Sequence, residues 1–130
     1  MAAVTASQRA LAAFFTLAGV MHFVIPQSYR AIVPEYVPIT PKRAVEWSGY
    51  AEIAGGLAVI PERTRGLARW WLVCLLIAVF PANVHMAVSP EAIRGLDAER
   101  IPRWALWARL PLQPLMAWWV WRATRRSALR

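Results

Sequence analysis

The sequence is poor in charged residues, especially acidic ones, and in cysteine. Charged residues make up 17% of the 130 residues, and seven of them are acidic, whereas soluble domains average about 25% charged residues. A single domain of this length therefore has little polar surface with which to cover its apolar side chains. Cys74 is the one cysteine, which excludes a disulfide framework, a CxxC redox pair and a thiolate metal cluster.

Hydrophobic residues are abundant, at 58% of the chain. They gather in four segments with few charges: residues 10–25, 44–60, 67–88 and 104–121. These lengths approach the roughly 20 residues with which a helix spans a bilayer core. Continuous apolar runs favour helices over barrel strands, whose side chains alternate. The sequence therefore predicts one all-α domain over residues 1–130, a four-helix transmembrane bundle whose loops are marked by prolines.

The net charge is +8, and the basic residues lie mainly between the apolar segments. They therefore indicate how the protein is oriented in a membrane, and no nucleic-acid partner is predicted. One side of the predicted bundle holds eight cations: Arg9, Arg63, Arg65, Arg69, Arg122, Arg125, Arg126 and Arg130. The other side holds six: Arg30, Lys42, Arg43, Arg94, Arg100 and Arg103. The positive-inside rule then predicts that both termini are cytoplasmic, with membrane lipid as the surrounding partner.

Polar side chains inside the predicted spans are the candidate functional residues, because a charge there costs roughly 2.5–3.5 kcal/mol. They are His22, Glu52, Asn83, His85 and Arg109. Neighbouring helices run in opposite directions, so a rise of about 1.5 Å per residue places all five roughly 5–12 Å below the outer boundary. The sequence therefore predicts a polar pocket that opens outward.

Three further residues extend this predicted pocket. Ser48 lies one helical turn before Glu52, and Gln113 lies one turn after Arg109. Tyr29 lies in the predicted loop of residues 26–43, which would fold over the pocket as a lid. Pro81 in the third segment should bend its helix near the same level.

Structural roles compete with these functional ones. Glu52 and Arg109 would form a buried ion pair that fixes helix packing, and each histidine would hydrogen-bond water at the headgroup level. Tyr29 would be an interfacial anchor. Two histidines and a carboxylate could ligate a metal, but neither HxxxH nor HExxH spacing is present, so no metal site is predicted.

Several motifs resemble those of the DoxX-like family of small bacterial membrane proteins. They are GVMHFVIPQSYRAIVPEYVP (residues 19–38), WSGYAEIAGG (47–56), PERTRGLA (61–68), VFPANVHMA (79–87) and RLPLQ (109–113). The resemblance implies a four-helix bundle in the bacterial cytoplasmic membrane and an association with redox systems such as thiosulfate:quinone oxidoreductase. The matching polar positions are His22, Tyr29, Ser48, Glu52, Asn83, Arg109 and Gln113. His85 departs from the family, whose members often have tyrosine there.

The leading functional hypothesis is a membrane redox component that binds a quinone or a similar small molecule in this pocket. His22 and Arg109 would donate hydrogen bonds to the ligand, and Glu52 would carry the proton that accompanies each electron. A partner redox enzyme would exchange the electrons, so whether the chain is itself an oxidoreductase stays open, as does a homo-oligomeric state. The alternatives are an assembly or scaffolding membrane protein that recognises helices or lipids, and a small proton-coupled transporter.

Overall fold

The computed structural model describes residues 2–89 and 102–125, and helices make up 81% of them. No strand occurs among these residues, which confirms the predicted all-α class. The helices are α1 (Ala6–Val24), α2 (Pro26–Arg30), α3 (Pro41–Ala58), α4 (Glu62–Val88) and α5 (Arg103–Thr124). The four long helices coincide closely with the four apolar segments, whereas the short α2 falls in what the sequence predicted to be a loop.

Local hydrogen bonds explain where α1 begins. The backbone N–H of Gln8 donates to Thr5 Oγ1 at 3.1 Å, and the backbone N–H of Thr5 donates to Gln8 Oε1 at 3.0 Å. This capping box satisfies backbone donors that a helix start leaves free, so α1 begins at Ala6, before the apolar run does. It ends at Val24 because Ile25 precedes Pro26, and a residue before proline is disfavoured in the helical conformation.

The turn between α3 and α4 is held by side chains of α4. Arg65 donates from Nε to the carbonyl oxygen of Val59 and from Nη2 to that of Ile60, both at 2.8 Å. Thr64 Oγ1 donates to the carbonyl oxygen of Ala58 at 2.7 Å. These bonds satisfy carbonyls that the end of a helix leaves without partners. α4 therefore begins at Glu62, directly after Pro61, and includes the arginines predicted to lie in a loop.

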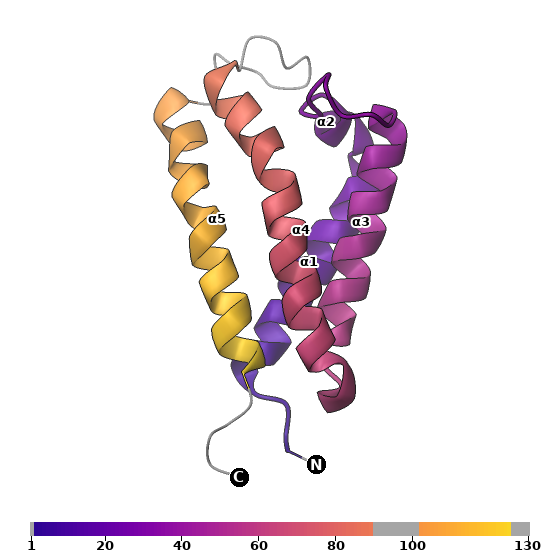
Figure 1. Cartoon of the computed structure of the whole chain (residues 1–130), viewed down its shortest axis with the longest axis vertical. Coiled ribbons are helices and arrows are strands. Elements are labelled where there is room, and N and C mark those ends of the chain that lie inside the picture. The colour runs from indigo at the N-terminus through magenta and orange to yellow at the C-terminus, as the bar shows by residue number, and fades with distance from the viewer. Residues whose placement is uncertain (1, 90–101, 126–130) are drawn as a thin grey trace.

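The long helices form a ring in which each one contacts two others. α1 packs along α3 and α4 packs along α5, while α3 also meets α4 and α1 meets α5. Figure 1 shows that α1 begins and α5 ends at the same end of the bundle, and that α2 lies at the opposite end. These are called below the termini end and the α2 end.

Two apolar clusters pack at opposite ends of the bundle, and polar side chains lie at the level between them. The cluster at the termini end centres on Leu11, Phe15, Leu72 and Val120. The cluster at the α2 end contains Met86, Ala87 and Leu106. Asn83 lies between the two clusters along α4, and Arg109 and Gln113 lie between them along α5. The candidate site is built at this level.

Only α4, among the described helices, is both long and apolar enough to cross a membrane by length and composition alone. α3 has four charged residues in 18, namely Lys42, Arg43, Glu46 and Glu52. α5 contains three arginines. The structure thus supports one possible membrane helix, and the arrangement with four spans remains a prediction.

Candidate functional site

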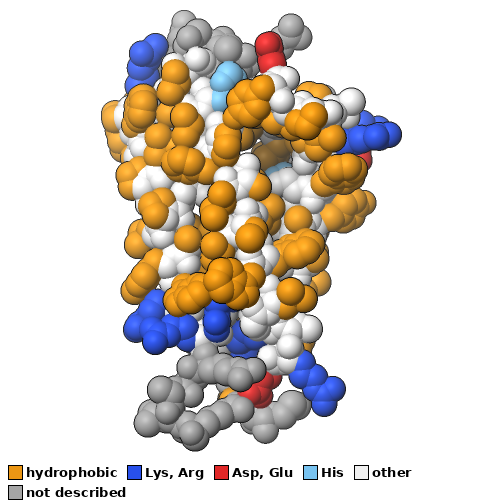
Figure 2. Space-filling view, viewed as in Figure 1, with side chains coloured by type: hydrophobic (Ala, Val, Ile, Leu, Met, Phe, Trp, Pro, Cys, Tyr) orange, Lys and Arg blue, Asp and Glu red, His pale blue; other side chains and the backbone are white. Residues whose placement is uncertain are grey.

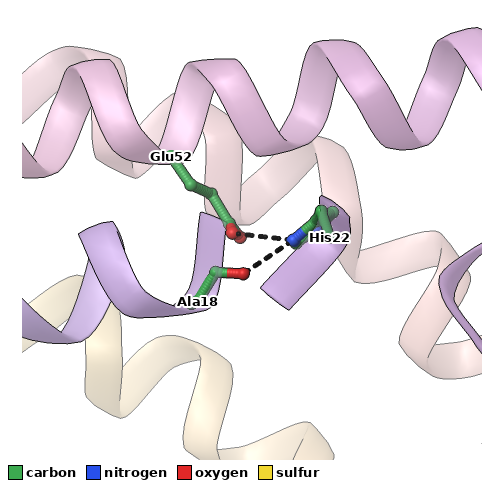
Figure 3. Close-up of polar contacts among 3 residues, drawn as sticks. All are labelled: Ala18, His22 and Glu52. Atoms are coloured by element: carbon green, nitrogen blue, oxygen red, sulfur yellow. Dashed lines mark hydrogen bonds and ion pairs between the residues drawn. The ribbon is translucent and has the colours of Figure 1, made fainter. Parts of the chain in front are cut away.

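His22 of α1 and Glu52 of α3 face each other inside the bundle, as Figure 3 shows. Nδ1 of His22 lies 2.8 Å from the carbonyl oxygen of Ala18 and 3.3 Å from Oε2 of Glu52. The two side chains are only 8% and 13% exposed. A ring nitrogen this close to a carbonyl oxygen must carry hydrogen, so His22 donates from Nδ1 to Ala18, and Nε2 of the neutral ring is an acceptor.

The carboxylate of Glu52 lacks the donor that it needs. Its Oε2 atom is buried and has no hydrogen-bond partner, because the Nδ1 hydrogen of His22 is directed to Ala18. A buried carboxylate oxygen without a donor is costly in free energy, and such atoms are rare in folded proteins. Glu52 is therefore the most unusual group at this level of the bundle.

Tyr29 of α2 covers the pair. Its ring is stacked on that of His22, with centroids 3.9 Å apart and planes 21° from parallel. Burial raises the pKa of the Tyr29 hydroxyl, the negative charge of Glu52 adds to this rise, and the positive charge of Arg109 opposes it. Tyr29 of the predicted lid thus lies against His22, and the outward-opening pocket stays a prediction.

Arg109 and Gln113 of α5 lie one helical turn apart. Arg109 is exposed, and its Nη1 atom lies 3.9 Å from Sδ of Met86 on α4. It forms no ion pair with Glu52, whose carboxylate lies beside His22 instead, so the predicted Glu52–Arg109 ion pair is not formed. Gln113 is half-buried, and its Oε1 atom is buried with no hydrogen-bond partner.

The remaining predicted residues join the site to different degrees. Ser48 is half-buried one turn before Glu52 on α3, and Asn83 of α4 is 8% exposed. His85 lies two residues from Asn83, which turns it about 200° around the helix axis. None of the hydrogen bonds, ion pairs or ring contacts found among the described residues joins His85 to His22 or Glu52. The site is therefore centred on one histidine.

The structure also shows two polar atoms in residues that the predicted site did not include. Nε of Arg30 on α2 and Oγ1 of Thr16 on α1 are buried without hydrogen-bond partners. The sequence placed Arg30 beside Tyr29 in the predicted loop, where both would touch a ligand headgroup or anchor the loop at the interface, whereas Thr16 looked like part of an apolar segment. Within residues 2–89 and 102–125, no group of three His, Cys, Asp or Glu side chains could hold a metal ion.

The chain belongs to the family described as Domain of unknown function (DUF8561), whose family model matches residues 11–124. This match covers most of α1, all of α3, α4 and α5, and the site residues. No curated protein and no solved structure matches the chain. The resemblance to the DoxX-like family stays a prediction.

Proposed function

We propose that the protein is an integral membrane protein in which α1, α3, α4 and α5 all cross the bilayer. Large apolar side chains are exposed on each of these helices, for example Leu17 (65%), Leu57 (56%), Ile77 (67%) and Trp118 (60%). Figure 2 shows hydrophobic side chains over the middle of the face in view, with lysine and arginine side chains toward both ends of the molecule. An apolar surface of this extent suits lipid better than water.

The proposal also orients the bundle, with the termini end in the cytoplasm. That end has six described arginines: Arg9, Arg63, Arg65, Arg69, Arg122 and Arg125. Arginine and lysine near span ends favour the cytoplasmic side. The site at Glu52 would then lie in the outer half of the bilayer, within the cytoplasmic membrane of a bacterium if the DoxX-like resemblance holds.

Cys74 offers a direct test of whether lipid covers α4, one of the four proposed spans. It is exposed on the surface of α4, about 18 Å along the helix from Glu62. We expect a membrane-impermeant maleimide to leave Cys74 unmodified in native membranes and to modify it after denaturation, because lipid covers it.

Single cysteines in a Cys74→Ser background give the orientation. Arg63→Cys at the termini end should react only in inside-out vesicles, and Ser28→Cys at the α2 end should react in intact cells. Both positions are exposed in the bundle. Rapid reaction of native Cys74 in folded protein would show that water covers α4 and would contradict the proposal.

The site supports binding of a small aromatic ligand with hydroxyl groups, of the quinol type, as part of a membrane redox system. One observation carries this proposal: Oε2 of Glu52 is buried without a donor. Gln113 Oε1 is a second buried acceptor without a donor. Two such acceptors favour a ligand that offers O–H groups, so the reduced form of a quinone suits them better than the oxidised form, which has only acceptors.

Each residue would have a defined role toward such a ligand. Glu52 would accept a hydrogen bond and then a proton from the ligand hydroxyl, and the Tyr29 ring would have to move aside for entry. Arg109 would donate to a ligand oxygen. His22 would accept a hydrogen bond from the ligand through Nε2, since its Nδ1 hydrogen is committed to Ala18. A partner redox enzyme would exchange electrons with the ligand.

Mass spectrometry of organic extracts tests this proposal. We expect wild-type protein purified in mild detergent to contain about one quinone or quinol per chain, because a hydrogen bond to a charged group contributes about 1.5–3 kcal/mol. Glu52→Met should lose this ligand. Glu46→Met, which removes a half-buried carboxylate from the same helix, should retain it. If all three proteins contain bulk lipid alone, the ligand proposal is wrong, and the assembly or scaffolding alternative should be pursued through co-purifying proteins.

A further inference from the structure

A wide depression with many arginines lies at the termini end, far from the Glu52 site. It has a volume of about 1670 Å³ and lies between the start of α4 and the end of α5. Five guanidinium groups line it: Arg63, Arg65, Arg69, Arg122 and Arg125. Glu62 contributes one carboxylate. This basic depression therefore has a strong excess of positive charge, and the proton and ligand roles of the Glu52 site make no use of it.

Two of the arginines are fixed in place by the fold. Arg65 is held by the carbonyl oxygens of Val59 and Ile60. Arg69 donates from Nε to Thr124 Oγ1 at 3.0 Å and from Nη2 to the Thr124 carbonyl oxygen, and its guanidinium lies 5.0 Å from the centroid of the Trp121 ring. Arginines that are already ordered lose little side-chain entropy when an anion binds. The other three, Arg63, Arg122 and Arg125, are exposed, and the guanidinium of Arg122 lies 5.7 Å from the centroid of the Trp118 ring.

Tryptophans next to the basic depression mark where headgroups meet acyl chains. Trp70 and Trp121 line it and contact each other edge to face, with centroids 5.2 Å apart. Exposed apolar side chains begin at the same level, with Leu67 68% and Trp70 57% exposed. Tryptophan is enriched at membrane interfaces. A ligand with an anionic head and an apolar tail would therefore contact arginines with its head and α4 with its tail.

We propose that the basic depression binds the phosphate headgroup of an anionic phospholipid from the cytoplasmic leaflet. Guanidinium groups bind phosphate oxygens through paired hydrogen bonds, and clustered arginines at the cytoplasmic surface attract anionic lipid. The depression has room for a headgroup and its water. This inference rests on the four-span proposal, because only then does the termini end lie at a lipid headgroup layer.

Native mass spectrometry of the full chain in mild detergent tests the inference with phosphatidylglycerol and phosphatidylcholine. The test variant combines Arg63→Gln, Arg122→Gln and Arg125→Gln, which spares the two arginines that hold the fold. The control combines Lys42→Gln, Arg43→Gln and Arg103→Gln, which removes the same charge from exposed residues at the α2 end. We expect wild type and control to prefer phosphatidylglycerol, and the test variant to bind it about a hundredfold more weakly.

Three results would overturn the inference. They are an unchanged preference in the test variant, an equal loss in the control, and displacement of the lipid by excess inorganic phosphate, which would identify a site for soluble anions. The Cys74 experiment keeps the two proposals separable. If Cys74 is protected in membranes, and Ser28→Cys and Arg63→Cys react from opposite sides, while wild type shows no lipid preference, the membrane placement of α3 and α4 stands and the lipid site alone fails.

Discussion

Replacing Gly19 by alanine is expected to lower the free energy of unfolding by about 1–3 kcal/mol, the usual effect of overpacking. A Cβ atom at Gly19 of α1 would lie 2.7 Å from the carbonyl oxygen of Gly49 and 3.0 Å from the backbone nitrogen of Ile53, both on α3. These backbone atoms cannot move aside as a flexible side chain can. The new methyl group would therefore push α1 away from α3.

Gly66→Ala provides a matched control for this prediction. It adds the same methyl group to α4 where nothing lies within 4 Å. We expect it to be neutral or to stabilise the helix by up to about 1 kcal/mol, since alanine has a higher helix propensity than glycine. Thermal unfolding in mild detergent, followed by tryptophan fluorescence, measures both variants. Equal stability of the two would show that α1 and α3 are not in close contact in solution.

The same close contact positions the candidate site. Gly49 lies one turn before Glu52 and Ile53, and a Cβ atom at Gly49 would lie 2.9 Å from Cβ of His22. Small residues in this part of α1 and α3 thus bring His22 within 3.3 Å of Glu52. Separating the helices with Gly19→Ala should therefore weaken ligand retention as well as stability, whereas Gly66→Ala should leave ligand retention unchanged.

Much of the helical architecture could be predicted because it depends on local patterns. Apolar runs and the prolines at positions 26, 41, 61 and 102 located the four long helices to within a few residues. The start of α1 was missed because the Thr5–Gln8 capping box lies outside the apolar run. α2 was missed because five residues show no clear hydrophobic period, and its backbone is shaped by contacts with α1 and α3.

The candidate site could be predicted only in part. Counting residues along opposed helices grouped His22 and Glu52, which the structure brings into contact. It could not separate His85 from that group, since counting gives depth in the membrane and leaves the facing direction open. Nor could it show that His22 donates to Ala18, because the choice of partner depends on a side-chain rotamer. The basic depression was also missed, since it combines side chains more than 50 residues apart, as in the bond from Arg69 to Thr124.

Glu52→Met is expected to raise the free energy of unfolding by about 1–3 kcal/mol, the usual cost of a buried polar group that has no hydrogen-bond partner. Methionine is unbranched, so it can occupy the space of the glutamate without crowding its neighbours. The substitution removes a buried oxygen that has no donor. It leaves no new polar atom without a partner, because Nδ1 of His22 still donates to Ala18.

The sign of this stability change separates a functional Glu52 from a structural one. Loss of one partner from a structural buried pair would lower stability by about 3–5 kcal/mol, since the other charge is left unpaired. A rise in stability together with loss of the bound ligand would instead mark Glu52 as a residue kept for function at the expense of stability. Thermal unfolding of ligand-stripped protein measures the sign, with Glu46→Met as the control that should change little. A large fall in stability for Glu52→Met alone would assign Glu52 and His22 to helix packing and would remove the main support for a ligand at this site.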